Sequence, residues 1–162
     1  MNVDLEWPPL PDYGCFPRWP QDGDDFIHPD DRPLATRYIP SQRVLRRDKF
    51  DGTYYHYSYG TLRFRLRPVM WSKVESDGID IGDEVETTGM LLERELFVAT
   101  VWGMYYVARK GCILYRLKKG DMPVPRLYAA KELRLLTRKD VVGERTFDYR
   151  PPTWDGTADL EL

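Results

Sequence analysis

Apolar and polar residues alternate along residues 53–59 and again along residues 62–67, and a period of two predicts β-strands. Gly60 marks a turn between the two runs. A further strand is expected at residues 69–74, so we predict an antiparallel β-meander over residues 43–74. The second run presents three outward-facing arginines: Arg63, Arg65 and Arg67.

The second half of the chain predicts another group of strands. Residues 96–108 form a long β-branched and aromatic run, in which Gly103 permits a bulge or bend. The remaining expected elements are strands at 84–87, 112–117, 123–128 and 135–136, a hairpin turn at 118–121, and one helical turn at 129–133. We detect no internal repeat.

The first 40 residues hold eight of the 13 prolines, interleaved with aromatic residues. Proline fixes φ and removes a backbone donor, so neither a regular helix nor a central strand is expected here. The aromatic residues favour an extended arm packed along the domain, and a disordered tail is the alternative. The predicted divisions are a Pro-rich acidic arm (1–42), a β-meander with a basic face (43–74), a second β unit (75–139) and an acidic tail (140–162), with 43–139 as one compact body.

The net charge of −2 hides an alternation of charged blocks along the 162 residues. Acidic residues dominate 1–31, 74–95 and 140–162, whereas basic residues dominate 32–73 and 96–139. The blocks are expected to neutralise each other across the folded surface. Alternatively, the two basic blocks share a face that attracts a polyanion.

The expected localisation of the protein and the redox state of its cysteines rest on sequence patterns that the chain lacks. No run of about 18 apolar residues and no secretory signal is present, so we expect a cytoplasmic protein with no membrane partner. Cys15 and Cys112 are the two cysteines, and neither belongs to a metal-binding or disulfide pattern. We expect reduced thiols, with Cys112 buried and inert in an apolar row with Leu114.

Residues 82–136 resemble the small SH3-like barrels of the Tudor and KOW type. The resemblance rests on the opening strand Gly82-Asp83-Glu84-Val85, the long bent second strand, and the helical turn before a last strand. It implies an SH3-like barrel at 75–139. Together with the patterns above, it gives a mainly β fold with this barrel beside the meander, Pro-rich irregular arms packed outside and little helix. It also implies partner binding through aromatic residues, here Trp102, Tyr105, Tyr106 and Tyr115. The alternative is that these rings fill the gap between two sheets or support the arms.

Linear signatures of catalysis are absent from the chain. The sequence lacks GxxxxGK[ST], GxGxxG, GxSxG and HExxH, so no nucleotide cradle, nucleophile elbow or helix-borne zinc site is indicated and no cofactor is expected. His56 would become a general base if Asp48 or Asp51 paired with it. No nucleophile accompanies it, which favours a hydrogen-bonded histidine on a strand surface.

A metal site is not predicted either. The acidic stretch 22–31 fails as a calcium loop, because Phe26 occupies the fifth position and Pro33 the twelfth. A loose divalent-cation site of Asp24, His28 and Asp30 is a minor alternative to a solvated acidic turn.

The resulting hypothesis is a non-enzymatic binding or scaffold module whose partner is a protein or peptide. The alternative is a nucleic-acid-binding accessory protein that uses the arginine strand face, through Arg46, Arg47, Arg63, Arg65 and Arg67. Against it stands a pI of about 5.7. The arginines are also expected to pair with acidic residues of the same chain, either Asp24, Asp25, Asp30 and Asp31 of the arm or Glu84, Glu86, Glu93 and Glu95. A small enzyme without a linear motif is the third possibility.

Overall fold

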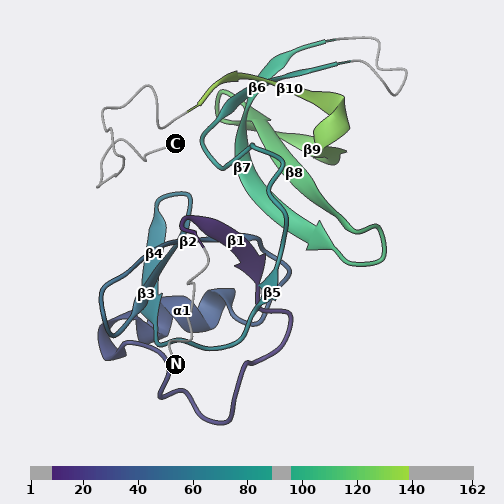
Figure 1. The fold of residues 1–162 in the computed structure, drawn as a ribbon. Helices are drawn as coiled ribbons and strands as arrows, with labels where there is room; N and C mark the ends of the chain where they lie inside the picture. The colour runs from purple at the N-terminus through teal and green to yellow at the C-terminus, as the bar shows by residue number, and fades with distance from the viewer. Residues whose placement is uncertain (1–8, 89–95, 139–162) are drawn as a thin grey trace.

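A computed structural model of the chain describes residues 9–88 and 96–138 and shows two five-stranded antiparallel sheets (Figure 1). The first sheet consists of β1 (Asp12–Cys15), β2 (Leu45–Phe50), β3 (Tyr55–Tyr59), β4 (Leu62–Leu66) and β5 (Ser72–Lys73). The second consists of β6 (Glu84–Thr87), β7 (Val98–Val107), β8 (Cys112–Lys119), β9 (Met122–Ala129) and β10 (Leu133–Thr137). The mainly β prediction is confirmed, although the sheets are not closed into a barrel.

The two sheets have the same strand order. The first runs β4-β3-β2-β1-β5 and the second β9-β8-β7-β6-β10, so in each the fifth strand pairs with the first. The hairpin between the third and fourth strands has a two-residue turn that begins with a glycine at positive φ, Gly60 at 65° and Gly120 at 60°. Each second strand also has a bulge against the third. The structure therefore contains a topological repeat that the sequence analysis did not detect.

The Pro-rich N-terminal segment contributes regular structure, and the prediction that it has neither helix nor central strand is wrong. Strand β1 lies between β2 and β5 and pairs with both. The short helices are η1 (Pro29–Asp31), α1 (Arg32–Tyr38) and, in the second half, η2 (Ala130–Glu132). Prolines are tolerated because they flank β1, as Pro11 and Pro17 do, or occupy the first turn of α1, as Pro33 does.

The core follows the predicted alternation. Tyr55, Tyr57 and Tyr59 on β3 are buried, and so are Phe64 and Leu66 on β4. In the second sheet the buried side chains include Val101, Met104, Tyr115 and Leu117. Large apolar residues on the inner faces of both sheets supply most of the driving force for folding.

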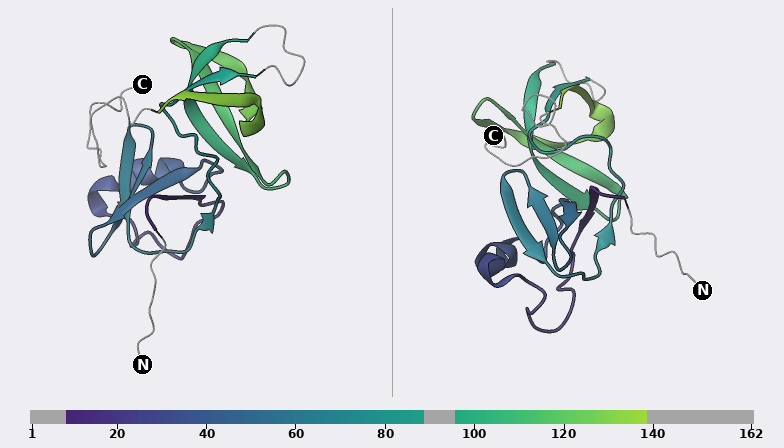
Figure 2. Two further views of the ribbon diagram at one scale, coloured as in Figure 1. Left: turned by 45° about the horizontal axis from the view of Figure 1, so that its top comes forward. Right: turned by 60° about the vertical axis from the view of Figure 1, so that its left-hand side comes forward.

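The two sheets are joined by backbone hydrogen bonds as well as by the connecting segment (Figure 2). Strand β6 pairs with the first part of β7 and not with its second part. One edge of the second part of β7 is therefore not paired with β6. The segment before β2 pairs with that edge, because Val44 N donates to Met104 O at 2.9 Å and Tyr106 N donates to Gln42 O at 2.8 Å. The two sheets therefore share a β-bridge.

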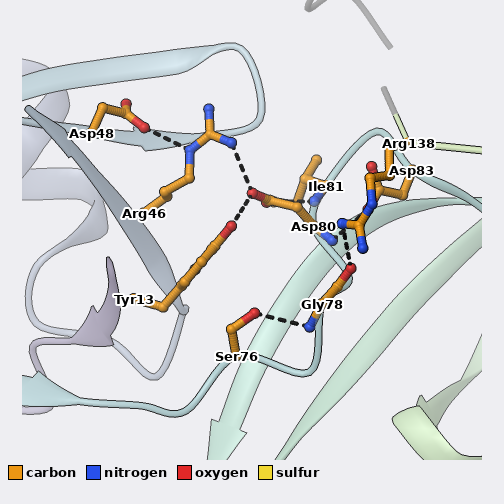
Figure 3. A network of polar contacts seen from close by, with 9 residues as sticks. All are labelled: Tyr13, Arg46, Asp48, Ser76, Gly78, Asp80, Ile81, Asp83 and Arg138. Atoms are coloured by element: carbon orange, nitrogen blue, oxygen red, sulfur yellow. Dashed lines mark hydrogen bonds and ion pairs between the residues drawn. The ribbon is translucent and has the colours of Figure 1, made fainter. Parts of the chain in front are cut away.

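A polar network fixes the segment between β5 and β6 (Figure 3). Asp80 Oδ2 accepts hydrogen bonds from the Tyr13 hydroxyl at 2.7 Å and from Arg46 at 3.1 Å. Burial raises the pKa of Tyr13 well above its ordinary value, and the charge of Asp80 raises it further. On the other side, Arg138 donates to Gly78 O at 3.0 Å. The connecting segment thus contacts residues of both sheets.

In the described parts of the chain, no helix has the length and apolar character needed to cross a membrane.

Candidate binding surface

Strands β7 and β8 carry large side chains on both faces. Their inner face is buried, whereas a sheet face turned to solvent is usually polar. The outer face of β7–β8 instead presents Trp102, Tyr105, Leu114 and Arg116. Trp102 is 36% exposed and the other three are half-buried. We take this outer face of β7–β8 as the candidate binding surface.

The bulge in β7 places the rings on this face. Val101 pairs with Leu117 and Gly103 pairs with Arg116, so Trp102 is the extra residue between the two pairs. A Cβ at Gly103 would come within 3.1 Å of the Tyr105 ring and 3.2 Å of Arg116 Cβ. The bulge expected at Gly103 is confirmed, and the missing side chain there makes room for the Tyr105 ring.

Arg116 lies close to both aromatic rings. Its guanidinium carbon is 5.7 Å from the centroid of the Trp102 ring and 5.6 Å from that of Tyr105. The indole is held in place because Trp102 Nε1 donates to Leu117 O at 3.1 Å. In residues 9–88 and 96–138, no carboxylate forms an ion pair with Arg116. The surface therefore combines aromatic area with a positive charge that has no carboxylate partner among the described residues.

Aromatic and arginine contacts continue from this face to the first sheet. Tyr105 neighbours Tyr59 and helps to raise its pKa, and the Tyr59 hydroxyl accepts a hydrogen bond from Met104 N at 3.0 Å. Burial raises the pKa of Tyr59 above its ordinary value, although the backbone hydrogen bond with Met104 opposes the shift. The guanidinium carbon of Arg43 lies 4.8 Å from the Tyr38 centroid and 6.0 Å from that of Tyr59. We name this set the aromatic–arginine row: Tyr38, Arg43, Tyr59, Tyr105, Arg116 and Trp102.

The four aromatic residues predicted from sequence have different surroundings. Trp102 and Tyr105 lie together around Arg116. Tyr106 is half-buried and packs against the core. Tyr115 is fully buried, and its hydroxyl donates to Asp77 at 2.7 Å. Of the four, Trp102 and Tyr105 therefore define the outer surface, whereas Tyr115 belongs to the core.

The arginines of the predicted polyanion surface are largely paired inside the molecule. Arg65 donates to both carboxylate oxygens of Asp31, at 2.7 and 3.1 Å. Burial raises the pKa of Asp31, but the hydrogen bonds and charge of Arg65 outweigh it, so that pKa lies below its ordinary value. Arg46 is buried and bonds Asp48 as well as Asp80, while Arg67 lies over the ring of Tyr54 at 5.1 Å. Arg63 also has interactions within the fold. The expected partners Glu93 and Glu95 lie outside the described residues.

Arg47 is buried in a site that the sequence did not reveal. Its guanidinium carbon is 4.3 Å from the Tyr55 centroid and 4.7 Å from that of Trp71. It donates to both carboxylate oxygens of Asp12, at 2.9 and 2.7 Å. Gly14 leaves room for Trp71, because a Cβ there would lie 2.8 Å from the indole. The sequence did not predict the pairing of Arg47 with Asp12, because the prolines around Asp12 argue against a strand there.

The structure pairs His56 with Asp51, one of the two carboxylates considered for it. His56 Nε2 lies 2.8 Å from Asp51 Oδ2, which confirms a hydrogen-bonded histidine on a strand. Cys112 is half-buried, so its predicted burial is wrong; the alternation of β8 turns it toward the outer face with Leu114 and Arg116. His56 lies on β3 in the first sheet, whereas Cys112 lies on β8 in the second.

Residues of the candidate cation site, Asp24, His28 and Asp30, interact with other groups of the chain. Asp24 pairs with Arg32 at 3.1 Å, and His28 Nδ1 accepts from Asp30 N at 3.1 Å. Both cysteines are free thiols. Among the residues that the structure describes, no group of three or more His, Cys, Asp or Glu side chains is arranged to hold a metal ion.

Comparison with known proteins gives a family but no function. A model of a family of unknown function, DUF6960, matches residues 6–134. The chain belongs to DUF6960. No curated protein and no solved structure matches the chain. The region that matches DUF6960 includes β1 to β9, η2 and every residue of the aromatic–arginine row.

Proposed function

We propose that this DUF6960 protein is a peptide- or protein-binding module and that the outer face of β7–β8 is its contact surface. The observation that carries the proposal is the exposed indole of Trp102 beside Arg116, which has no carboxylate partner among the described residues. Tryptophan and arginine are enriched among the residues that dominate binding energy at interfaces. An aromatic outer sheet face is also a typical sign of an interaction site.

Features of the second sheet support a likeness to SH3-like barrels. Gly82 and Asp83 precede β6, β7 is long and bulged, and η2 leads directly into β10. These are the features on which the sequence resemblance rested, and barrels of this type bind peptides, methylated side chains or nucleic acid through aromatic residues and loops at one edge. The likeness concerns architecture, and the proposed function depends on the surface itself.

The nucleic-acid alternative requires arginines that are available to phosphates. Carboxylates of this chain already pair with Arg46, Arg47 and Arg65. We therefore place the contact surface on β7–β8 and not on the arginines of β2 and β4.

Selection from a phage-displayed library of random peptides tests the proposal. Purified wild-type protein is expected to enrich a set of related peptides, and Trp102→Ala to lower their binding by about tenfold or more. Met70→Ala is the matched control, because Met70 is 85% exposed but lies outside the β7–β8 face. It should bind the same peptides as wild type does.

Thermal unfolding of each variant verifies that its fold is intact. Failure to enrich any peptide family contradicts the proposal, as does equal binding by wild type and Trp102→Ala.

A further inference from the structure

Each of the two sheets has an arginine whose guanidinium lies close to two aromatic rings. Arg47 lies close to Tyr55 and Trp71, and Arg116 lies close to Trp102 and Tyr105. At both sites the guanidinium contacts the faces of the rings. Its N–H groups, which lie at the edge of its plane, can therefore still donate hydrogen bonds to another group.

The two sites differ in what their N–H groups contact. Asp12 accepts two hydrogen bonds from Arg47, in the bidentate geometry that matches a guanidinium to a carboxylate. Arg116 has no such partner among the described carboxylates. Glu86 on neighbouring β6 is bonded to Arg134. The buried site therefore shows, within this chain, which kind of group fits an arginine in such surroundings, and the described residues supply none to Arg116.

We propose that the outer face of β7–β8 binds an acidic peptide segment, whose Asp or Glu carboxylate takes the position at Arg116 that Asp12 takes at Arg47. This inference rests on the proposed function and specifies its ligand. Apolar side chains of the same segment cover Trp102 and Leu114.

The aromatic–arginine row extends the site for a second acidic residue. Arg43 lies over the rings of Tyr38 and Tyr59 and has no carboxylate partner among the described residues either. Tyr105 connects the two arginines, because its backbone pairs with Arg43 and its ring lies beside Arg116. A peptide that follows Tyr105 thus meets two positive charges separated by aromatic surface.

Carboxylates fit this surface better than a nucleic-acid backbone does. Affinity for nucleic acid comes mainly from many phosphate contacts, and several arginines that would make them are bonded to Asp12, Asp31, Asp48 and Asp80. The net charge of −2 gives no overall attraction for a polyanion. Two local cations beside apolar rings suit a short acidic and apolar segment.

The test uses the peptide recovered by the selection and a twin in which every Asp becomes Asn and every Glu becomes Gln. Fluorescence anisotropy with the full chain is expected to show about tenfold or more weaker binding of the twin, because a charge-assisted hydrogen bond is lost. Arg116→Gln should weaken binding of the acidic peptide by a similar factor. Arg116→Lys should also weaken it, because lysine keeps the charge but loses the planar fork.

Lys118→Gln is the matched control, since Lys118 is two residues along β8 on the same face and carries the same charge. It should change the affinity by less than about threefold. An equal loss in Lys118→Gln and Arg116→Gln would overturn the inference in favour of general charge attraction. Tighter binding of an oligothymidylate that displaces the peptide would overturn it in favour of nucleic acid.

The two proposals fail in different ways. If the selection enriches no peptide, the proposed function fails and the inference fails with it. If enriched peptides lose binding in Trp102→Ala but bind equally well as neutral twins, the proposed function holds and the acidic ligand is excluded.

Discussion

Arg47 in the first sheet and Arg116 in the second have similar aromatic surroundings and opposite polar ones. Arg47 is 7% exposed and its partner Asp12 is 6% exposed, so both charges are satisfied inside the fold. Arg116 is half-buried beside the exposed indole of Trp102, and none of the carboxylates that the structure describes pairs with it. An arginine that is buried with its counter-ion stabilises one packing arrangement, whereas an arginine left at a surface without one is available to a partner.

The difference arises from the strands that carry the two arginines. Arg47 lies on β2, directly opposite Asp12 on the neighbouring strand β1. Arg116 lies on β8, whose neighbours β7 and β9 place Gly103 and Leu127 opposite it. Although the two sheets repeat one topology, the arginines occupy different strands of it. The exposed site is therefore a feature of the second sheet and not a copy of the buried one.

The largest effect is expected from breaking the buried pair. Arg47→Gln leaves the charge of Asp12 buried without its partner and should lower the free energy of unfolding by about 3–5 kcal/mol. Urea unfolding measures this loss. The double change of Arg47→Met with Asp12→Leu should restore most of it, because no uncompensated charge remains. A loss below about 1 kcal/mol in the single variant would show that Arg47 is not a structural cation.

An intermediate effect is expected at the Arg65–Asp31 pair, where arginine and carboxylate meet nearer the surface. The folded pKa of Asp31 is lowered, so the pair contributes fully above the unfolded value near about 4 and less as pH falls through the folded value. We expect Asp31→Asn to lower stability by about 1 kcal/mol at neutral pH, because Arg65 is partly exposed. The loss relative to wild type should shrink on acidification.

Thermal unfolding from about pH 6 to about pH 3 measures this difference. Asp25→Asn is the control, because Asp25 is an exposed acid of the same segment. A pH profile of Asp31→Asn that stays parallel to that of wild type would contradict the assignment.

Local patterns were sufficient to predict most strands. The alternation through Phe64 and Leu66 identified the buried face of β4, and the glycines at 60 and 120 identified two hairpins. These patterns predict structure well because successive side chains of a strand point to opposite faces of the sheet, and because a tight hairpin turn needs residues at positive φ. The strand β1 was missed because proline frequency was read as excluding a strand, whereas the prolines flank it.

The candidate site was predicted in part. Trp102 and Tyr105 were selected for their chemistry, but Arg116 was not connected with them. That connection depends on the bulge between Val101 and Gly103. The bulge determines which residues of β7 face outward and which residues of β8 lie opposite them. Pairing of Arg47 with Asp12 spans 35 positions and depends on strand register. Neither contact leaves a local pattern in the sequence.

The smallest effect on folding is expected from Arg116→Gln, and it decides whether the two arginines differ as described. Removing a half-buried cation that lies close to two rings should lower the free energy of unfolding by less than about 1 kcal/mol. Urea unfolding beside Arg47→Gln provides the measurement under identical conditions. If Arg116→Gln destabilises the protein as much as Arg47→Gln does, Arg116 is structural and its charge is satisfied within the fold. A small loss of stability together with a large loss of peptide affinity is the combination that only a binding residue produces.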